Sequence, residues 1–470
     1  MKAIPKGLFR AYDIRGIANE ELTSHNAFQI GRSIGSQLEG STSPRILLGR
    51  DARLSSPRIA DSLAEGLIHA GCDIIDIGQV PTPVLYFALQ HFSIDNGVVV
   101  TGSHNPPEYN GIKIVLDQHC LHTHGITALY DRILQKKLHI AEQKGTIEHR
   151  TIFDAYSQAV LNDVSLQRRL RIGLDCGNGI TGAFAVKLFE RLGCEVHPLF
   201  CEVDGTFPNH SPDPTKPENL KALQALVQKE QLDIGIAFDG DGDRMIAVDG
   251  QGKILWPDRI MALLAQNVLA EHPNRSVVFD VKCSQILPQA IEKSGGISVM
   301  SPSGHSLLKA KMLEEKAIMG GEFSGHILLN DRQWRFNDDG IYAAARLLEY
   351  LSQSKQTPTE VFANIADSYS TPEYKLYFSS PEAAQAAVKD FCTYHVLDGA
   401  NISFVDGLRA DFEDCWGLAR ASNTSPTITL RFEARTQERL TFIQDLFRNN
   451  LRVLDHDVVW NDGFILDTEV

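Results

Sequence analysis

The chain repeats one pattern three times, and this repeat constrains its fold more than any other feature. Each copy begins with a short apolar segment that ends near an aspartate, continues through a helical stretch to a glycine turn, and ends in a second apolar segment. The opening segments are residues 45–51, 171–175 and 276–280. Strand–helix–strand alternation with short connections implies right-handed crossovers and mostly parallel sheets. The repeat therefore predicts three homologous α/β domains.

The second half of each copy also repeats, as an apolar strand, a polar loop that contains glycine, and a hairpin-like apolar strand. The three loops span residues 101–111, 239–244 and 320–326. Because ligands usually bind at loops that follow the carboxyl ends of strands in α/β proteins, we expect the three loops to face one shared cleft. The predicted domains are 1–150, 151–253 and 254–367, followed by a fourth domain without the repeat at 368–470.

Composition narrows the class of protein. The chain has 470 residues, of which 43% are hydrophobic and 22% are charged, as in soluble globular proteins with several cores. Its net charge of −14 argues against a nucleic-acid partner. It has no apolar run of the about 18–20 residues that a membrane span needs, and charged residues stand where a signal peptide needs an apolar core. Its eight cysteines form no C-x-x-C pair and indicate reduced thiols. We therefore expect a cytoplasmic protein with no membrane partner, in which any phosphate site is a local concentration of positive charge.

The first loop, Thr101-Gly-Ser-His-Asn-Pro-Pro107, contains a candidate nucleophile. Gly102 and the two prolines favour an irregular backbone that could expose the hydroxyl of Ser103. A serine exposed in this way can accept a phosphoryl group when a cation and oriented donors neutralise the charge. A turn capped by the serine is the structural alternative.

The second loop, Asp239-Gly-Asp-Gly-Asp-Arg244, contains a candidate metal site. Alternate residues point the same way in an extended or turn backbone, so the three carboxylates could hold one cation. Oxygen ligands favour Mg²⁺ or Ca²⁺ over zinc. An EF-hand is excluded, because it needs Gly at position six and Glu at position twelve, where this chain has Arg244 and Gly250. Arg244 would suit a phosphate oxygen, which a guanidinium binds with two hydrogen bonds.

Two further loops carry weaker signals. In Gly320-Gly-Glu-Phe-Ser-Gly-His326, Glu322 and Ser324 could hydrogen-bond adjacent sugar hydroxyls, and Glu322 stands where a nucleophile elbow needs glycine. Arg420-Ala-Ser-Asn-Thr-Ser-Pro426 could form an anion-binding nest or a plain polar turn. The alternating Cys120, His122 and His124 could suggest zinc, but they fall at a hairpin turn outside the shared loops, and we do not expect a metal there.

In order and spacing, four of these motifs resemble those of the α-D-phosphohexomutases. They are Thr-Gly-Ser-His-Asn-Pro, Asp-Gly-Asp-Gly-Asp-Arg, Gly-Glu-x-Ser-Gly-His and Arg-x-Ser-Asn-Thr. The resemblance covers essentially the whole chain, beginning at Tyr12-Asp-Ile-Arg-Gly16, and is greatest to the bacterial phosphomannomutase/phosphoglucomutase branch. It implies three α/β domains with mixed sheets and a C-terminal α+β domain, similar to the TATA-box-binding protein, around a central cleft.

The resemblance also implies roles for individual residues. Ser103 resembles the phosphoserine, and Asp239, Asp241 and Asp243 resemble the Mg²⁺ ligands, with the Ser103 phosphate completing the coordination. Lys113 is the candidate general acid/base, and its pKa should be lowered by Arg244 and Mg²⁺. The other expected catalytic residues are Arg15, His104 and Arg244. The expected substrate-binding residues are Tyr12, Lys282, His305, Glu322, Ser324, His326, Arg420, Ser422, Asn423, Thr424 and Arg431.

The implied reaction interconverts hexose 1-phosphates and 6-phosphates. The phosphoserine would phosphorylate the free hydroxyl, and the resulting glucose or mannose 1,6-bisphosphate would reorient before the other phosphate returns to Ser103, with a hinge near residues 367–370. We expect a monomer whose partners are small-molecule hexose phosphates. A sugar-phosphate phosphatase would instead release stoichiometric inorganic phosphate, and a non-catalytic sensor would bind without isomerisation. Mannose and glucose both remain open, whereas Ser-Asn-Thr-Ser after Arg420 and Ala421 makes an amino sugar less expected, because phosphoglucosamine mutases commonly carry Ser-Gly-Thr-Glu.

Overall fold

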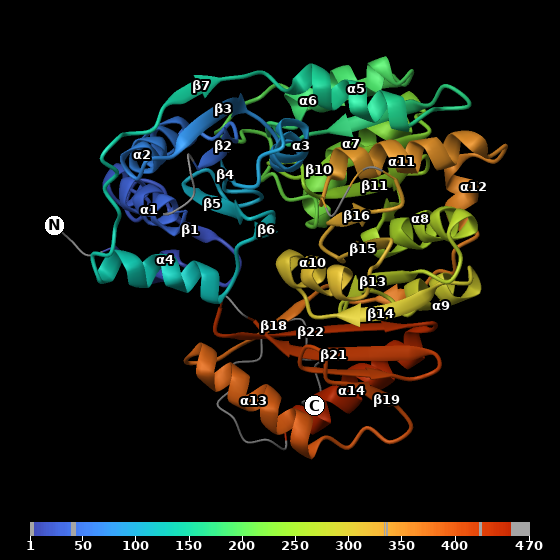
Figure 1. Ribbon diagram of the computed structural model, residues 1–470. Helices are drawn as coiled ribbons and strands as arrows, with labels where there is room; N and C mark the ends of the chain where they lie inside the picture. Colours follow the sequence, from blue (N-terminus) through green and yellow to red (C-terminus); the bar gives the residue numbers. More distant parts are fainter. Residues whose placement is uncertain (1–3, 39–43, 333, 335–336, 423–424, 453–470) are drawn as a thin grey trace. The chain divides into compact units, whose positions relative to one another are not determined.

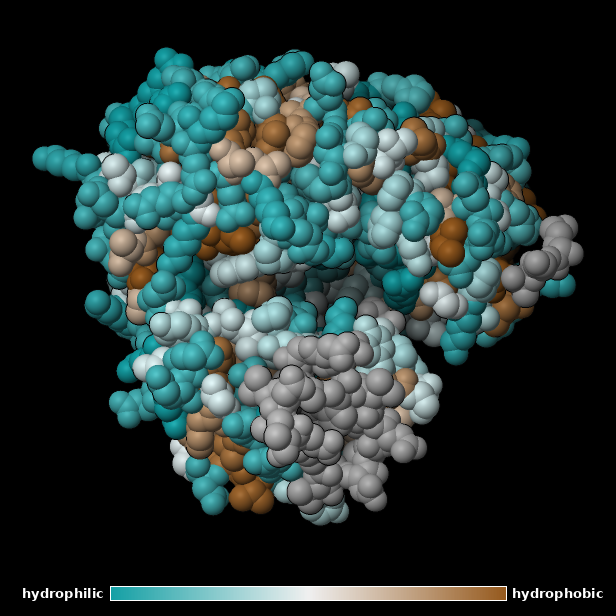
Figure 2. Space-filling view, turned by 180° about the vertical axis from the view of Figure 1, so that it is seen from behind, coloured by the Kyte–Doolittle hydropathy of each residue, from teal (hydrophilic) through white to brown (hydrophobic). Residues whose placement is uncertain are grey.

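The structure is a computed structural model that describes residues 4–38, 44–332, 334, 337–422 and 425–452, and the chain forms two compact units (Figure 1). Unit one comprises Met1–Asn267 and Ser324–Phe362, and unit two comprises Val268–Phe323 and Ala363–Val470. None of the helices in the described part of the chain is long and apolar enough to cross a membrane. On the face shown in Figure 2, hydrophilic residues cover most of the described surface.

Unit one begins with a seven-stranded mixed sheet in the order β1-β5-β4-β2-β3-β7, with β6 beside β5. Its strands are β1 (Ile14–Ile17), β2 (Arg45–Arg50), β3 (Asp73–Gln79), β4 (Gly97–Val100), β5 (Tyr109–Leu116), β6 (His119–Cys120) and β7 (Ile147–His149). The helices are η1 (Lys6–Leu8), α1 (Ser24–Gln37), α2 (Ser56–His69), α3 (Thr82–Phe92) and α4 (His124–Leu134). Strand β2 runs parallel to β3 and β4, whereas β5 is antiparallel to β1 and β4.

Helices cover this first sheet closely. Ile46 and Leu48 of β2 belong to the core cluster of α1, α2 and α4, and α3 contacts β2 and β4. Strand β4 is buried at every position, as expected for a strand covered on both faces. Helices α1 and α2 approach each other at small residues, since a Cβ on Gly31 would lie 2.2 Å from the carbonyl oxygen of Leu63.

The second sheet of unit one has the order β12-β11-β10-β8-β9. Its elements are α5 (Phe153–Asp163), β8 (Arg171–Asp175), α6 (Gly182–Arg191), β9 (Glu195–Leu199), α7 (Pro217–Glu230), β10 (Ile234–Phe238), β11 (Met245–Asp249) and β12 (Ile254–Leu255). Strand β8 is parallel to β9 and β10, and β10 is antiparallel to β11. Strand β16 (Ile327–Leu329) and helices α11 (Gly340–Gln353) and α12 (Pro358–Ala363) follow, while α8 (Pro257–Glu271) runs on into unit two.

In unit two, β13 pairs in parallel with β14 and β15. These elements are β13 (Ser276–Asp280), α9 (Ile286–Lys293), β14 (Ile297–Ser301), α10 (His305–Glu314) and β15 (Met319–Gly321). An antiparallel six-stranded sheet follows in the order β17-β22-β21-β20-β19, with β18 beside β22. Its elements are β17 (Tyr369–Ser370), β18 (Tyr374–Tyr377), α13 (Pro381–Tyr394), β19 (Asn401–Ser403), β20 (Leu408–Asp411), β21 (Cys415–Ala421), β22 (Thr427–Ala434) and α14 (Gln437–Arg452).

The two central strands of this last sheet, β21 and β22, are buried on both faces. One face packs against α13 and α14. The other face carries Trp416, which packs with Val281, and Arg409 donates hydrogen bonds of 2.6 Å to the carbonyl oxygens of Val281 and Cys283. Three α/β sheets followed by an antiparallel α+β segment confirm the predicted fold class, and none of the eight cysteines, all of which are described, forms a disulfide.

Candidate active site

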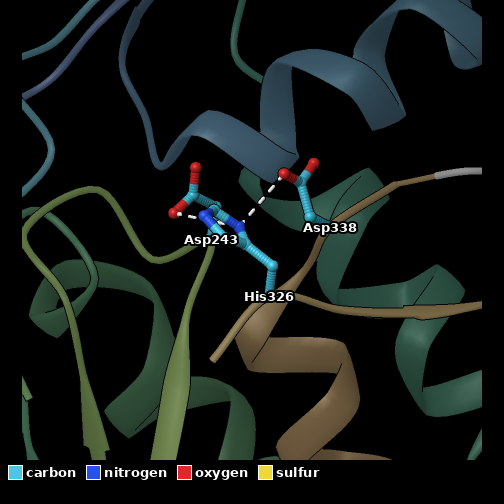
Figure 3. Close-up of side chains that lie close together, drawn as sticks. All are labelled: Asp243, His326 and Asp338. Atoms are coloured by element: carbon cyan, nitrogen blue, oxygen red, sulfur yellow. Dashed lines mark ion pairs between the residues drawn. The ribbon is translucent and has the colours of Figure 1, made fainter. Parts of the chain in front are cut away.

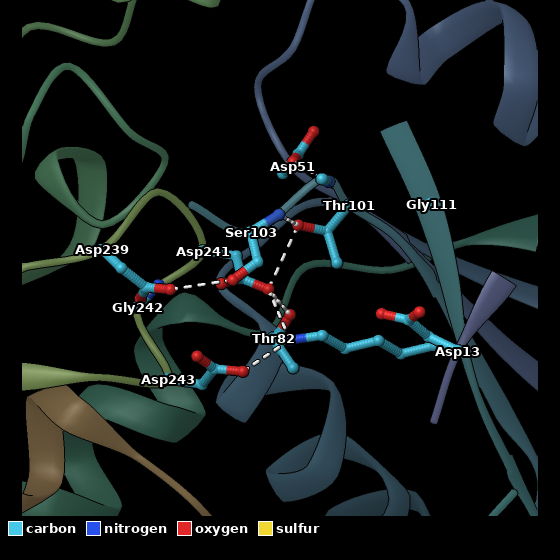
Figure 4. Close-up of polar contacts among 12 residues, drawn as sticks. Asp13, Asp51, Thr82, Thr101, Ser103, Gly111, Asp239, Asp241, Gly242 and Asp243 are labelled. Carbon is cyan, nitrogen blue, oxygen red and sulfur yellow. Dashed lines mark hydrogen bonds and ion pairs between the residues drawn. The ribbon is translucent and has the colours of Figure 1, made fainter. Parts of the chain in front are cut away.

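Ser103 lies in the loop between β4 and β5 and is buried. Its φ of +48° lies in the left-handed region, which is uncommon for a residue with a side chain and costs free energy. Its Oγ donates a hydrogen bond of 2.9 Å to Oδ2 of Asp239 (Figure 4). The same Oγ lies 3.1 Å from Nδ1 of His104. The hydroxyl of Ser103 therefore faces the loop that contains Asp239, and the residue has an unusual backbone conformation there.

The aspartate loop connects β10 to β11, and it places Asp239, Asp241 and Asp243 side by side in the interior. One carboxylate oxygen of each lies within 4.8 Å of the others. The loop packs directly against the Ser103 loop, because a Cβ on Gly240 would lie 2.5 Å from the carbonyl oxygen of Ser103. The structure thus brings together the first two loops that the sequence singled out.

Two oxygens of this cluster are well placed to bind a cation. Oδ1 of Asp241 and Oδ1 of Asp243 are buried and make no hydrogen bond within the described part of the chain. Burial, together with repulsion from Asp243 and Asp241, raises the pKa of Asp239 well above its usual range. Buried carboxylates with unused lone pairs need positive charge, and an all-oxygen set suits Mg²⁺. The residues therefore fit the predicted metal.

Lys113 of β5 supplies positive charge from within the chain. Its Nζ lies 2.8 Å from Oδ2 of Asp241 and 2.5 Å from Oδ2 of Asp243. Burial lowers the pKa of Lys113, but the two carboxylates outweigh burial and raise this pKa above its ordinary value. The sequence predicts the opposite direction from Arg244 and Mg²⁺ together, whereas the two aspartates determine the direction among the contacts of the chain itself. In this arrangement Lys113 holds its proton.

Arg244, His326 and Asp338 form a chain of contacts beside the aspartate loop. Figure 3 shows His326 with its two carboxylate neighbours, Asp243 and Asp338. Nε of Arg244 donates a hydrogen bond of 2.9 Å to Nε2 of His326, and Nδ1 of His326 lies 3.2 Å from Oδ2 of Asp338. Because the arginine Nε always carries hydrogen, Nε2 must be the accepting nitrogen and Nδ1 carries the ring proton. The sequence did not indicate Asp338, which lies 12 residues beyond His326 with no motif around it.

Arg15 and His104 complete this part of the site. Arg15 of β1 pairs with Asp13 and donates a hydrogen bond of 2.6 Å to Oδ1 of Asn105 in the Ser103 loop. Burial, and then the charges of Arg244 and Arg15, lower the pKa of His104 well below its usual value. The ring of His104 is therefore neutral near pH 7. Tyr12 lies just before β1.

Unit two holds another group of predicted residues. Oε1 of Glu322 accepts a hydrogen bond of 2.6 Å from the backbone N–H of Gly304, just before His305. The guanidinium of Arg431 stacks 3.3 Å from the ring centroid of Phe323. The chain divides within the third loop, so that Ser324 and His326 belong to unit one.

Three cations of unit two gather around one carboxylate that the sequence did not indicate. The Nζ of Lys282 lies 3.2 Å from Glu373, and Lys282, with further help from Arg431 and Arg420, lowers the pKa of Glu373. Nε of Arg420 also donates a hydrogen bond of 2.7 Å to Asp406. Such a concentration of positive charge could bind a phosphate dianion.

Ser422 lies two residues beyond Arg420. The Oγ of Ser422 accepts a hydrogen bond of 3.2 Å from the N–H of Ser425. The predicted Asn423 and Thr424 lie outside the described residues.

Within the described residues, two groups of side chains could hold a metal ion, Asp239–Asp241–Asp243 and Asp243–His326–Asp338. In the second group, Nε2 of His326 accepts a hydrogen bond from Arg244, while Nδ1 lies 3.2 Å from Asp338 and 3.7 Å from Asp243. Cys120, His122 and His124 are not among these groups.

Four family models match successive parts of the chain. The models for phosphoglucomutase/phosphomannomutase α/β/α domains I, II and III match residues 6–138, 154–252 and 256–369, and the model for the C-terminal domain matches residues 373–450. The chain belongs to the phosphoglucomutase/phosphomannomutase family.

Individual relatives resemble the chain over nearly its full length. It is 45% identical over 458 residues to a phosphomannomutase/phosphoglucomutase of Pseudomonas putida, covering 96% of each chain. It is 42% identical over 461 residues to a phosphoglucomutase of Neisseria gonorrhoeae, covering 98% of this chain and all of the relative. The crystal structure of a Burkholderia thailandensis protein of the same family superposes with a TM-score of 0.92 at 40% identity, covering 97% of this chain and 99% of the other.

Proposed function

We propose that the protein is a phosphohexomutase that interconverts the 1-phosphates and 6-phosphates of mannose, glucose or both. Ser103 would carry the transferable phosphoryl group, and a hexose 1,6-bisphosphate would be the intermediate and activator. The observation that carries this proposal is the buried Ser103 hydroxyl, 2.9 Å from one of three clustered aspartates. A relative at 45% identity named phosphomannomutase/phosphoglucomutase and one at 42% identity named phosphoglucomutase support it.

Asp239, Asp241 and Asp243 would hold Mg²⁺, with the phosphate on Ser103 as a further ligand. When bound, the ion would neutralise charge on the phosphoryl group. Thr82 and Thr101 each donate a hydrogen bond to Oδ2 of Asp241, at 2.6 and 3.1 Å, and so fix its carboxylate.

The chain's own residues would position groups and hold protons. Arg244, oriented by His326, would bind phosphoryl oxygens. Lys113, which keeps its proton at Nζ, would act as a neutralising charge and a hydrogen-bond donor rather than as a base. Neutral His104 could accept the proton from Oγ of Ser103, 3.1 Å from its Nδ1. Arg15 would hold the Ser103 loop through Asn105.

Unit two would bind the sugar and its other phosphate. Glu322 and Ser324 are each proposed to bind hydroxyl groups, and the cations gathered around Glu373 would bind the phosphate that does not react. The residues proposed for substrate binding are Tyr12, Lys282, His305, Glu322, Ser324, His326, Arg420, Ser422, Asn423, Thr424 and Arg431. We also propose that the enzyme works in the cytoplasm as a monomer, with no nucleic-acid partner. Size-exclusion chromatography with light scattering can test the oligomeric state.

The test replaces the nucleophile and compares it with a matched serine. Ser103→Ala should lower the rate of conversion of mannose and glucose 1-phosphates by at least about 10³-fold. Peptide mass spectrometry should find phosphate on Ser103 of the wild type. Ser93→Ala is the control, because Ser93 also has a left-handed backbone, with φ of +54°, at the exposed end of α3. Full turnover by Ser103→Ala would overturn the proposal.

Two alternatives give different results in the same assay. Stoichiometric release of inorganic phosphate would indicate a phosphatase. Binding of sugar phosphate with no isomerisation, even with added glucose 1,6-bisphosphate, would indicate a sensor.

A further inference from the structure

A buried arginine outside the predicted site holds the backbone of the Ser103 loop. Arg53 lies between β2 and α2 and is only 1% exposed. Its Nη2 donates hydrogen bonds to the carbonyl oxygens of Ser103, at 2.8 Å, and Asn105, at 2.6 Å. Its Nη1 donates to the carbonyl oxygens of Pro106, at 2.6 Å, and Tyr109, at 3.0 Å. One guanidinium thus binds four carbonyl groups of a single short loop.

Asp51 connects this guanidinium to the same loop. Its Oδ2 accepts a hydrogen bond of 3.2 Å from Nε of Arg53 and one of 3.0 Å from the backbone N–H of Gly102. Oδ1 of Asp51 accepts from the backbone N–H of Arg53 at 3.1 Å. Arg53 and Asp51 therefore bind both the carbonyl and the N–H groups that surround Ser103.

The loop is shaped to admit the guanidinium. A Cβ on Gly102 would lie 2.4 Å from Nε and 2.5 Å from Cζ of Arg53, which is closer than any real contact. On the next residue, Ser103 holds a φ of +48°, which a residue with a side chain keeps only when its surroundings impose it. The Arg53 hydrogen bond to the Ser103 carbonyl is one such constraint, and close packing against Gly240 is another.

We propose that Arg53 is a positioning residue for phosphoryl transfer, and that it holds Ser103 in the left-handed conformation that directs Oγ toward Asp239. This inference rests on the proposed role of Ser103 as the phosphorylated residue. The planar fork of a guanidinium can serve four carbonyl groups at once, whereas the single nitrogen of a lysine cannot reach both pairs. Arg53 acts on the reaction through the loop and contacts no reacting atom.

The chain offers a matched control on the same segment. Arg58 of α2 also donates to backbone carbonyl groups, with Nη2 at 2.6 Å from the oxygen of Ala18 and Nη1 at 3.4 Å from that of Leu22. These carbonyl groups belong to the segment between β1 and α1 and not to the Ser103 loop. Arg53→Lys and Arg58→Lys therefore remove the same kind of contact from two different segments.

The kinetic test compares these two variants with the wild type. Arg53→Lys should lower kcat about 100-fold, the loss expected when a reacting group is misplaced by about 1 Å, while KM for hexose 1-phosphate changes by less than about twofold. Arg58→Lys should leave both constants within about twofold of the wild type. Equal kcat values in the two variants would overturn the proposal.

A second variant keeps Arg53 but displaces its guanidinium with a new side chain at residue 102. Gly102→Ala should lower kcat in the wild-type background but cause little further loss when combined with Arg53→Lys, because the Cβ acts by displacing the guanidinium. Losses that simply multiply would contradict the proposal. This double-mutant cycle remains informative if one single variant folds poorly, because the kcat of each variant can be normalised to its folded fraction, measured by circular dichroism.

A third measurement does not depend on activity. Amide hydrogen exchange over residues 101–109 should become faster in Arg53→Lys and stay unchanged in Arg58→Lys. If the wild type neither isomerises sugar phosphates nor carries phosphate on Ser103, the proposed function fails, yet the exchange result still shows whether Arg53 holds the loop. Unchanged exchange in Arg53→Lys overturns the inference in either case.

Discussion

Replacing Lys113 with methionine should destabilise the fold and make it more dependent on Mg²⁺. The substitution keeps the length of the side chain and removes the ammonium that contacts Asp241 at 2.8 Å and Asp243 at 2.5 Å. The side chains of these three residues are only 8%, 0% and 1% exposed. The carboxylates left behind are therefore buried, close together and without their cationic partner.

The magnitude follows from this burial. Removing one partner of a buried ion pair costs about 3–5 kcal/mol, because it leaves an uncompensated charge in the interior. Such a loss is a large part of the about 5–15 kcal/mol that stabilises a typical folded protein. Mg²⁺ bound only by the folded state would restore about 2.7 kcal/mol at a concentration 100 times its Kd. The restoration should be larger in Lys113→Met than in the wild type, in which the ammonium on the Oδ2 atoms already neutralises part of the charge of the same two carboxylates.

The assay is urea unfolding followed by circular dichroism, first in EDTA and then over a series of Mg²⁺ concentrations, with unchanged m values required for the comparison. Lys311→Met is the matched control, because Lys311 pairs with Glu314 at 3.2 Å and Glu315 at 2.8 Å on the surface of α10. An exposed pair of this kind contributes about 0–1 kcal/mol.

Two results would refute this reasoning. One is a free energy of unfolding for Lys113→Met in EDTA within about 1 kcal/mol of the Lys311→Met value. The other is an equal Mg²⁺ response in the wild type and in Lys113→Met, which would mean that the lysine and the ion do not neutralise the same carboxylates.

Two further predictions concern side chains away from the aspartate loop. Nε2 of His210 lies 3.2 Å from the carboxylate of Asp175; burial lowers the pKa of His210, but this hydrogen bond outweighs burial and raises it. The folded state then binds the proton more tightly, so this contribution to stability is complete below the ordinary pKa of about 6.5 and is lost as the pH rises through the higher folded pKa. His210→Gln should flatten the fall in Tm over that pH interval. An unchanged dependence of Tm on pH would contradict this role of the His210–Asp175 pair. Asp339 accepts hydrogen bonds from the hydroxyl of Tyr156, at 3.0 Å, and Nε1 of Trp334, at 3.1 Å, and it caps α11. Asp339→Ala should therefore cost about 3–6 kcal/mol of unfolding free energy, since it strands two buried donors and removes a cap, and a loss below about 1 kcal/mol would be incompatible with these contacts.

Much of the local structure was predictable because it depends on neighbouring residues. Two of the predicted repeat strands, 171–175 and 276–280, coincide with β8 and β13. A short apolar run between polar residues has few alternatives to a buried strand. Two of the three repeated loops also lie next to each other in unit one, as expected for loops at the ends of strands.

Other parts of the site could not be predicted, because they depend on contacts between distant segments. Asp338 and Glu373 lie outside every motif, and only the folded chain brings them to His326 and Lys282. Arg53 was missed for the same reason, since its four acceptors are backbone carbonyl groups, which leave no signature in a sequence.

The sequence by itself determined the residues that carry the chemistry and their local arrangement. Alternating aspartates and glycines place three carboxylates together wherever the loop lies, because the spacing is a property of the backbone. Tertiary structure alone decided the protonation states and directions of these groups. Lys113 stands 128 residues before Asp241, and its pKa rises because folding places it between two buried carboxylates, whose field is strong where water is excluded. In the same way, the Ser103 motif names a nucleophile, whereas its direction is set by a buried guanidinium from another segment of the chain.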